Sequence, residues 1–450
     1  MSSFVRASKF RHVYCDPPRI DATIQNLRVS NVTGEHNYIK ANPHYFAVGL
    51  QGGGGPLAII PLKTVGKMKT DIPVFAGHSG PILDFDFNPF HDSLIATGSE
   101  DMTIKVWEIP ENGLTTNISV PVQDLGGHAR KVILLRFHPT ASNVLGSVGG
   151  DQTIKVWDIE KGVALNTLSD ACDQLIQDMV WDYTGKEYAF SCKDKAVRLV
   201  DARTATVSTK IENAHEGAKS MKMTYLGNHN KLLSVGFTRQ SHRQFKIWDP
   251  RNTSTELEKF DIDQAAGVIM PFFDPDTSLL YLAGKGDGNV RFYEFVNEPP
   301  YFYPLSDFRS NVSAKGMAFV PKRGLNVMGC ETARLLKLTN NSVEPLSFLV
   351  PRKADGFQED LYPDTSSGEP SHTADQWFQG SELPPKLCSL NPAVKGSSGG
   401  ASASSGSVEP SRVSFSAAKT PAVLMEELAK AQDRIKKLED LLKAKGIPFD

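Results

Sequence analysis

The feature that most constrains the fold of this chain is a 32-residue segment that occurs twice. Gly77–Glu108 reads GHSGPILDFDFNPFHDSLIATGSEDMTIKVWE, and Gly127–Asp158 reads GHARKVILLRFHPTASNVLGSVGGDQTIKVWD. In both copies a His precedes a Trp by 29 residues, and an Asp precedes the same Trp by six. Each copy holds two alternating apolar runs separated by a turn. Such a repeat predicts a fold built from successive copies of one structural unit.

Three weaker copies of the segment follow along the chain. The third ends in Val200-Asp201 where the first two have Trp and an acid, and in the fourth His242 replaces the Asp of the turn. The positions equivalent to the Trp are 43 to 50 residues apart, a spacing typical of the four-stranded blades of a β-propeller. They are Trp107, Trp157, Val200, Trp248 and Tyr293.

The segments on either side of these copies complete a ring of seven blades. Residues 38–75 hold enough strand for one blade, because HYFAVGLQGGGGPLAIIPL has two apolar runs around a Gly-rich turn. Residues 301–350 supply part of a last blade, and we expect a strand near Val5–Tyr14 to complete it. Pairing the first segment with the last removes the open edge of a ring. The sequence therefore predicts an all-β fold, a seven-bladed β-propeller over residues 1–350.

Three segments without this strand pattern follow the propeller. We expect residues 351–392 to pack on it as an extension, because their aromatic side chains are unlikely to lie in water. Residues 393–420 contain GSSGGASASSGS, the composition of a flexible linker. Residues 421–446 have apolar residues at alternating spacings of four and three, typical of a coiled coil. The aromatic residues of the extension include Phe357, Tyr362, Trp377 and Phe378.

The predicted coiled coil is about three heptads long, and an isolated helix of that length is marginal in water. It therefore predicts association with copies of itself or with a partner. Arg434 falls at a g position and Glu439 at the following e position, where an ion pair between helices can form. Ile at one a position and Leu at most d positions are compatible with a dimer. The apolar seam consists of Leu424, Leu428, Ala431, Ile435, Leu438 and Leu442.

The composition limits the partners of the chain. A net charge of −2 over 450 residues gives no overall attraction to nucleic acid or anionic membranes, so an acidic partner requires a local basic patch. The five cysteines include no CxxC pair, which predicts a reduced, intracellular protein without structural zinc. No apolar run is long enough to cross a bilayer, and the first residues lack a signal core. We expect no cofactor and no metal.

The first two copies each contain a hydroxyl, an imidazole and a carboxylate, the components of a hydrolytic triad. The alternative is a hydrogen-bonded brace that joins the loop, the turn and the inner strands of a blade. A catalyst needs one such set, whereas a repeat fold needs one per blade. The repetition therefore favours the structural role and predicts that the protein is not an enzyme. The two sets are His78, Thr97, Asp101 and Trp107, and His128, Ser147, Asp151 and Trp157.

Basic residues are concentrated near the start of the chain. The first thirty residues carry five basic side chains against two acidic ones. Such a group is most often a solvated surface, but members that converge on one rim form a patch suited to an acidic protein surface. The five are Arg6, Lys9, Arg11, Arg19 and Arg28.

Several stretches together resemble those of one protein family. They are SKFRHV near the start, IPENGLT after the first repeat, CKDKAVR in the third, NAHEGAKSM, FFDPDTSLLY and GKGDGNVR in the fourth and fifth, and then EPPY, PKRGL, VPRKAD and FQEDLYPDT. With these matches in this order over essentially its full length, the chain resembles the coronins, a family of WD-repeat proteins.

The resemblance implies a non-enzymatic protein that binds actin filaments and takes part in their turnover, in the cytoplasm and at the actin-rich cell cortex. It also implies the branched-actin nucleation complex and cofilin as partners. The segment QNLRVS matches the family's filament contact and assigns it to Arg28, with Lys9 and Arg11 as basic neighbours. The segment RIKKLE matches the family's trimerisation signature, so the resemblance implies a homotrimer, with the dimer as the alternative. Its signature residues are Arg434, Ile435, Leu438 and Glu439.

Three hypotheses of function follow. In the first, the protein binds and bundles actin filaments, because the coil joins several weakly binding propellers and raises their effective concentration. In the second, it is a generic WD-repeat scaffold in trafficking or signalling. In the third, one of the His, hydroxyl and Asp sets is a hydrolase site.

Overall fold

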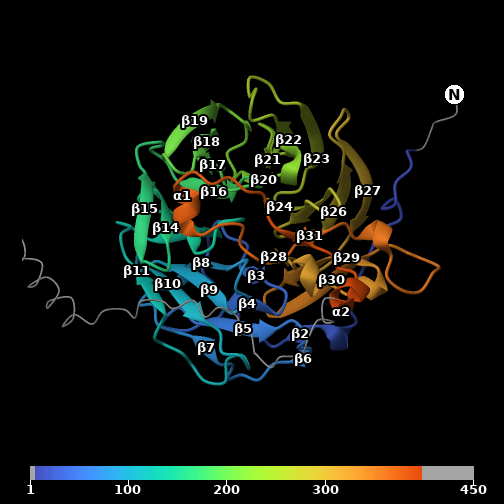
Figure 1. Ribbon diagram of the computed structural model, residues 1–450, viewed down its shortest axis with the longest axis horizontal. Coiled ribbons are helices and arrows are strands. Elements are labelled where there is room, and N and C mark those ends of the chain that lie inside the picture. Colours follow the sequence, from blue (N-terminus) through green and yellow to red (C-terminus); the bar gives the residue numbers. More distant parts are fainter. Residues whose placement is uncertain (1–5, 398–450) are drawn as a thin grey trace, which may run out of the picture.

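The chain folds into a ring of seven β-sheets around a central axis (Figure 1), and the computed structural model describes residues 6–397. Blade 1 consists of β3 (Ile39–Ala41), β4 (Tyr45–Gly49), β5 (Leu57–Pro61) and β7 (Val74–Phe75). Blade 2 consists of β8 (Ile82–Phe87), β9 (Leu94–Ser99), β10 (Ile104–Glu108) and β11 (Gln123–Leu125). Blade 3 consists of β12 (Val132–Phe137), β13 (Val144–Gly149), β14 (Ile154–Asp158) and β15 (Val163–Leu168). Blade 4 consists of β16 (Ile176–Trp181), β17 (Glu187–Cys192), β18 (Val197–Asp201) and β19 (Thr206–Ile211).

The ring continues with three further blades. Blade 5 consists of β20 (Lys222–Tyr225), β21 (Leu232–Phe237), β22 (Arg243–Trp248) and β23 (Glu258–Asp263). Blade 6 consists of β24 (Ile269–Asp274), β25 (Leu279–Gly284), β26 (Val290–Phe295) and β27 (Phe302–Phe308). Blade 7 consists of β28 (Gly316–Phe319), β29 (Glu331–Leu338), β30 (Ser342–Leu349), β1 (Tyr14–Asp16), β2 (Ile24–Gln25) and β6 (Gly66–Lys67). The prediction of a seven-bladed propeller is confirmed, and the segment Gly77–Glu108 lies in blade 2.

The first and last segments of the chain close the ring in blade 7. β1 pairs antiparallel with the end of β30, where Tyr14 lies opposite Leu349. β2 pairs with the start of β30, where Gln25 lies opposite Ser342. The early residues therefore supply the outer strand of the last blade, which removes its open edge.

The closing strand lies later in the chain than the predicted strand near Val5–Tyr14. Residues 9–12 form a turn instead, in which Val13 N–H donates to the carbonyl of Phe10 (3.0 Å). Phe10 and Val13 are buried in a cluster with residues of blades 6 and 7. The strand begins only at Tyr14, because these two apolar side chains anchor the preceding residues to the core.

The hydrophobic core is divided into clusters between neighbouring blades. Trp107 of blade 2 stacks on Phe75 of blade 1, with ring centroids 5.0 Å apart, in a cluster that also holds Leu57 and Ile95. β9 is buried along its whole length. Each sheet is covered on both sides by its neighbours, so its strands do not show a simple alternation of apolar and polar residues.

The ring has two faces. The hairpin face carries the turns between the second and third strands of the blades, such as residues 50–56 and 100–103. The extension face is crossed by residues 351–397, which Figure 1 shows in orange and red over the ring. The elements of the extension are η5 (Glu359–Leu361), β31 (Thr365–Ser366), α1 (Ala374–Phe378), β32 (Leu387–Cys388) and α2 (Pro392–Ser397). The other short helices are η1 (Ile20–Ala22), η2 (Gly227–His229), η3 (Lys322–Gly324) and η4 (Val327–Gly329).

The coiled coil predicted over residues 421–446 lies outside the described residues, as does most of the predicted linker. Among residues 6–397, no helix combines the length and the apolar character that crossing a bilayer requires.

Candidate functional site

The first predicted set of polar residues forms one hydrogen-bonded chain in blade 2. The indole N–H of Trp107, on β10, donates to Oγ1 of Thr97, on β9 (2.8 Å). Oγ1 of Thr97 lies 2.7 Å from Nε2 of His78, in the loop before β8. The other ring nitrogen of His78 lies 2.9 Å from Oδ2 of Asp101, in the turn after β9. The chain therefore ties two strands, a loop and a turn together.

Burial and charge fix the protonation of this set. Burial lowers the pKa of His78, so its ring is neutral at pH 7. Burial raises the pKa of Asp101, but hydrogen bonds from Thr103 and His78 outweigh this effect and lower that pKa to about 2. Asp101 is therefore a carboxylate that accepts the Nδ1–H of His78, and Thr97 donates its O–H to Nε2. The Thr97 side chain is 0% exposed, so a substrate does not reach the hydroxyl and the geometry favours a brace.

Blade 3 repeats the arrangement. Trp157 donates to Oγ of Ser147 (2.8 Å), which lies 2.7 Å from Nε2 of His128. Nδ1 of His128 lies 3.2 Å from Oδ2 of Asp151. A Cβ atom on Gly149 would lie 2.1 Å from Oδ1 of Asp151, so this form of the brace requires glycine at the end of β13.

Blade 5 holds only part of the brace. Trp248 donates to Oγ of Ser234, which lies 2.9 Å from Nε2 of His215. No carboxylate completes the set, because the turn has a His in place of the Asp, and Nδ1 of His215 has no hydrogen-bond partner among the described residues. The fully buried Arg243 instead donates through Nε and Nη2 to Asp263, both at 2.6 Å.

Arg28 lies at the hairpin face, between blades 7 and 1. The N–H of Leu27 donates to the carbonyl of Asn341 (2.9 Å), and the N–H of Gln51 donates to the carbonyl of Arg28 (2.8 Å). Leu27 and Val29 are buried, whereas Arg28 is exposed. Its side chain makes no hydrogen bond or ion pair with any residue in the described part of the chain. A fixed backbone therefore presents an unpaired guanidinium to the solvent.

Lys9 and Arg11, expected as basic neighbours of Arg28, lie at the opposite face. Residues 14–25 run along β30 from its end to its start, and so cross the height of blade 7. Lys9 precedes this segment and donates to the carbonyl of Asp360 in the extension, whereas Arg28 follows it. Closeness in the sequence is misleading here, because an extended segment separates the two groups.

Two lysines of a different segment instead lie beside the residues that precede Arg28. β6 runs parallel to β2, which places Lys67 beside the residues that lead to Arg28. The side-chain amide of Asn26 donates to the carbonyl of Met68 (2.9 Å), and Lys69 follows directly. Both lysines are exposed. The sequence shows them as KTVGKMKT, but nothing in that pattern indicates that the segment pairs with β2.

On the extension face, Trp377 anchors the extension to blades 3 and 4. Its side chain is fully buried, and its indole N–H donates to the carbonyl of Gly185 (3.2 Å). Its ring centroid lies 4.7 Å from that of His138, which lies 4.8 Å from that of Trp181. Burial lowers the pKa of His138 to about 3. The ring is therefore neutral, with Nε2–H donating to Gly185 (2.9 Å) and Nδ1 accepting from the N–H of Ala141 (2.8 Å).

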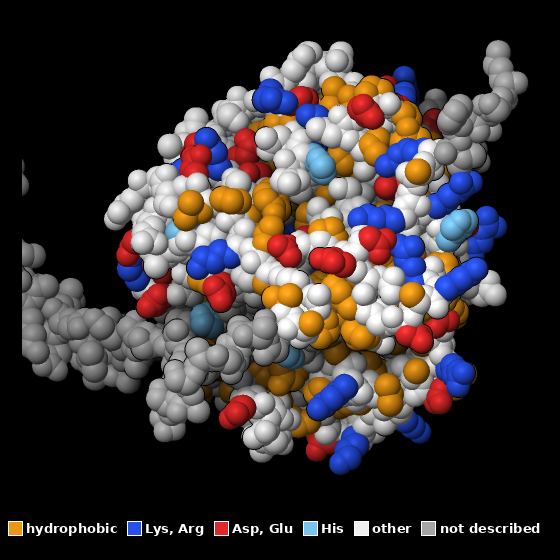
Figure 2. All heavy atoms as spheres, turned by 45° about the vertical axis from the view of Figure 1, so that its right-hand side comes forward, with side chains coloured by type: hydrophobic (Ala, Val, Ile, Leu, Met, Phe, Trp, Pro, Cys, Tyr) orange, Lys and Arg blue, Asp and Glu red, His pale blue; other side chains and the backbone are white. Residues whose placement is uncertain are grey.

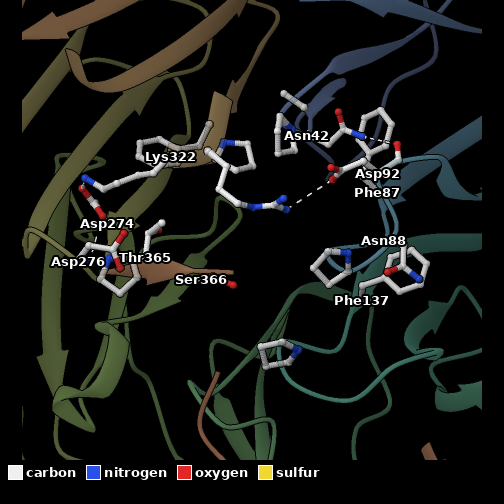
Figure 3. A pocket seen from close by; sticks show the side chains of 18 of the residues that line it. Asn42, Phe87, Asn88, Asp92, Phe137, Asp274, Asp276, Lys322, Thr365 and Ser366 are labelled. Atoms are coloured by element: carbon white, nitrogen blue, oxygen red, sulfur yellow. Dashed lines mark hydrogen bonds and ion pairs between the residues drawn. The ribbon is translucent and has the colours of Figure 1, made fainter. Parts of the chain in front are cut away.

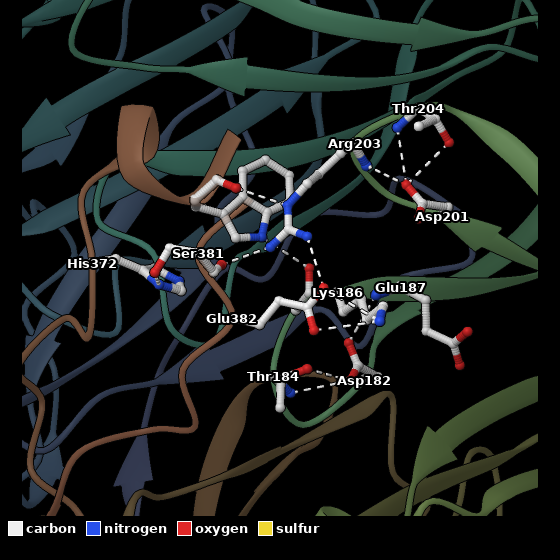
Figure 4. A network of polar contacts seen from close by, with 12 residues as sticks. Asp182, Thr184, Lys186, Glu187, Asp201, Arg203, Thr204, His372, Ser381 and Glu382 are labelled. Atoms are coloured by element: carbon white, nitrogen blue, oxygen red, sulfur yellow. Dashed lines mark hydrogen bonds and ion pairs between the residues drawn. The ribbon is translucent and has the colours of Figure 1, made fainter. Parts of the chain in front are cut away.

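Arg203 adds polar contacts to this anchor (Figure 4). Its Nε–H donates to the carbonyl of Trp377 (2.7 Å), and Nη2 donates to the carbonyl of Ser381 (2.6 Å). Nη1 pairs with Glu382 (3.0 Å), which also pairs with Lys186 (3.3 Å). The extension is thus held by carbonyl groups and ion pairs in addition to an apolar side chain.

Tyr362 anchors the first part of the extension. Its O–H donates to the carbonyl of Glu331 (3.0 Å), and its ring stacks on Phe357 at 5.3 Å. Phe378, which we also expected to leave water, remains 38% exposed. α1 turns Trp377 toward the blades, so the adjacent Phe378 points along a different side of the helix.

A cavity of about 400 Å³ also lies on the extension face, among loops of several blades and beside β31 (Figure 3). Phe87 and Phe137 give it apolar walls. Its basic groups are already paired, since Lys322 lies 2.5 Å from Asp274 and Arg323 lies 3.6 Å from Asp92. No sequence motif indicated this cavity, because its lining comes from loops far apart in the chain.

The space-filling view shows apolar side chains across the extension face and Lys and Arg side chains along its right-hand rim (Figure 2).

Within residues 6–397, no three His, Cys, Asp or Glu side chains are grouped so that they could hold a metal ion.

Comparisons with known proteins agree with this architecture. Residues 3–67 match a domain of unknown function (DUF1899), residues 69–108 and 119–158 match the WD domain, G-beta repeat, and residues 343–385 match a type of WD40 repeat. A chain in the crystal structure of the Mitotic Checkpoint Complex has a TM-score of 0.57 at 14% identity, covering 78% of this chain and 98% of its own. That likeness shows the fold alone.

Two closer relatives show the family. Coronin-A of Dictyostelium discoideum is 49% identical over 391 residues, which cover 87% of each protein. The crystal structure of the WD40 domain from Toxoplasma gondii coronin matches with a TM-score of 0.81 and 32% identity, over 85% of this chain and 98% of that one. With this identity over most of both proteins, the chain belongs to the coronin family.

Proposed function

We propose that this protein binds and bundles actin filaments, and that it thereby regulates filament turnover in the actin cytoskeleton. Membership of the coronin family supports an actin-associated role in general. The observation that carries the finer proposal is Arg28, an exposed guanidinium without an internal partner, held on a backbone that hydrogen bonds fix on both sides.

The filament contact that we propose is a basic surface made of Arg28, Lys67 and Lys69. Its three charges come from two parallel segments, and Lys67 is in register with β2. Basic groups on a rigid surface steer an acidic partner and fix its register more than they add affinity. Each propeller is therefore expected to bind a filament weakly.

The coiled coil over residues 421–446 would convert this weak contact into bundling. Joining propellers makes the second binding event intramolecular, which raises avidity without any new contact. We propose a homotrimer on the RIKKLE segment, with a dimer as the alternative, and the branched-actin nucleation complex and cofilin as further partners at the cell cortex. We propose no catalytic activity, because the hydroxyls of Thr97 and Ser147 are buried within braces.

Co-sedimentation tests this proposal with three proteins: the full chain, Arg28→Glu, and a chain without residues 421–450. High-speed pelleting with filaments measures binding, and low-speed pelleting measures bundling. Arg28→Glu is expected to reduce both, whereas the truncation is expected to abolish bundling more than binding. Analytical ultracentrifugation of the full chain distinguishes trimer from dimer. If both variants pellet and bundle like the full chain, the proposal is wrong.

The alternative of a generic scaffold predicts a different result in a pull-down. After filaments are depolymerised, a scaffold keeps its protein partners, whereas a filament-dependent protein loses them.

A further inference from the structure

Two cysteines that are 20 residues apart in the sequence meet in blade 4. Cys172 lies in the connection from blade 3, and Cys192 ends β17. Their sulfurs lie 3.4 Å and 3.3 Å from the same acceptor, the carbonyl oxygen of Gln174. The fold therefore creates a pair that the spacing of the cysteines conceals.

The surroundings of this pair differ from those of an inert buried thiol. The contact with Cys172 lowers the pKa of Cys192, although burial opposes this, and the same contact raises the pKa of Cys172. The pair therefore loses its first proton more readily than an isolated thiol does, and it holds the second more tightly. Two charged groups face it: Arg198 favours the thiolate, whereas the carboxylate of Asp194 opposes it on Cys192. By contrast, burial raises the pKa of Cys15 to about 12.

Access differs between the two sulfurs. Cys192 is fully buried, and Cys172 is only partly buried, in a loop at the hairpin end of the blade. A small oxidant reaches the pair from the side of Cys172. A thiol next to a thiolate, with access for a small molecule, is the arrangement of a redox-active dithiol.

We propose that Cys172 and Cys192 are a site of reversible oxidation, at which peroxide converts the two thiols into a disulfide. The thiolate attacks one oxygen of hydrogen peroxide, the O–O bond breaks, and hydroxide leaves and takes up a proton to form water. The sulfur becomes a sulfenic acid. The second thiol loses its proton, displaces the sulfenic oxygen as a second water, and forms the S–S bond. The two sulfurs together lose two electrons, which the peroxide gains. Two molecules of a small thiol such as glutathione reduce the disulfide back to two thiols and become a disulfide themselves.

The disulfide would join two segments that backbone hydrogen bonds now hold together. In the reduced protein, Lys193 N–H donates to the carbonyl of Leu175 (2.9 Å) beside the pair. A covalent bond would fix the connection between blades 3 and 4 to β17, and would restrict the unfolded chain. Oxidation is therefore expected to raise the melting temperature.

Peptide mapping of the full chain under native conditions tests the proposal. The protein is treated with hydrogen peroxide, its free thiols are alkylated, and it is digested without reduction for mass spectrometry. The expected product is one peptide joining Cys172 to Cys192, lighter by two hydrogens than the sum of its parts and lost on reduction, while Cys15 remains a thiol. If both cysteines are still alkylated when Cys15 is oxidised, or if either pairs with a different cysteine, the proposal is overturned.

A variant tests whether both sulfurs are needed. Cys172→Ser replaces the accessible sulfur and is expected to lose both the crosslink and the rise in melting temperature. Cys388→Ser is the matched control, and both the crosslink and the rise in melting temperature are expected to persist in it. An unchanged crosslinked mass in Cys172→Ser, or a melting temperature that peroxide leaves unchanged in the wild type, contradicts the proposal.

Discussion

The two faces of the ring stabilise their loops by different means. On the extension face, a later segment of the same chain covers the loops, with Trp377 buried against His138 and Arg203 bonded to backbone carbonyls. On the hairpin face, hydrogen-bonded braces such as His78–Asp101 tie the loops of blades 2 and 3 to their own blades. The extension thus stabilises the loops of one face by covering them, whereas hydrogen bonds inside the blades stabilise the loops of the other face.

This difference indicates which face is suited to a partner. A covered face offers its most apolar loops to its own chain. A braced face is rigid without a cover, so exposed groups on it are already organised for binding, which reduces the entropic cost of association. Arg28 lies on that face, with buried residues on both sides in the sequence.

The largest expected effect on stability is loss of the cover through Trp377→Ala. Truncating a fully buried Trp costs about 3–5 kcal/mol in the free energy of unfolding, and here it also leaves the carbonyl of Gly185 with one partner fewer. Urea unfolding measures the loss, and limited proteolysis is expected to cut the extension first. The matched control is Phe378→Ala, expected to change stability by about 0.5 kcal/mol or less because this neighbour is exposed. Equal losses in the two variants would contradict the assigned anchor.

The next largest loss of stability is expected for Thr97→Val, a variant that tests the braces. Valine keeps the shape but removes the hydroxyl, so the indole N–H of Trp107 and Nε2 of His78 lose their partner inside the blade. Leaving such groups unsatisfied costs about 1–3 kcal/mol, measurable by urea unfolding. Thr97→Ser is the control, since Ser147 has this role in blade 3. A tolerated valine together with a disruptive serine would be evidence against the brace.

A pH-dependent effect of similar size comes from His138. Its pKa is about 3 in the folded protein and about 6.5 in an unfolded chain. Between these values the unfolded state binds a proton that the folded state does not. The contribution of His138 to the free energy of unfolding is therefore complete above pH 6.5 and is lost as the pH falls toward 3. The contribution is about 1.4 kcal/mol per pH unit. Unfolding measured from pH 7 to 4.5 is expected to show a shallower slope for His138→Gln, and an unchanged slope would refute the assignment.

The blades were predictable from the sequence because the repeat places the same residue types at the same spacing, and His78, Thr97, Asp101 and Trp107 do meet. Features that depend on the closure of the ring were not predictable from the sequence. Lys67 becomes a neighbour of the Arg28 segment only through the parallel pairing of β6 with β2. The closing strand was misplaced because the apolar residues before Tyr14 anchor the chain to the core instead of extending the sheet.

The same limit applies to contacts between distant segments. The meeting of Cys172 with Cys192, and the cavity beside β31, depend on loops that the sequence does not place in space. Local patterns predict elements, whereas three-dimensional neighbours follow from the topology.

The smallest expected effect on stability, about 0.5 kcal/mol or less, belongs to Arg28→Glu, because Arg28 is exposed and has no internal partner. This variant nevertheless tests the central claim most directly. The measurement is the filament affinity of Arg28→Glu against that of Arg11→Glu, an equal charge reversal at the other face. The account predicts a loss of about tenfold or more for Arg28→Glu, about 1.4 kcal/mol of binding free energy, and an unchanged affinity for Arg11→Glu. Equal losses in the two variants, or a loss confined to Arg11→Glu, would contradict it.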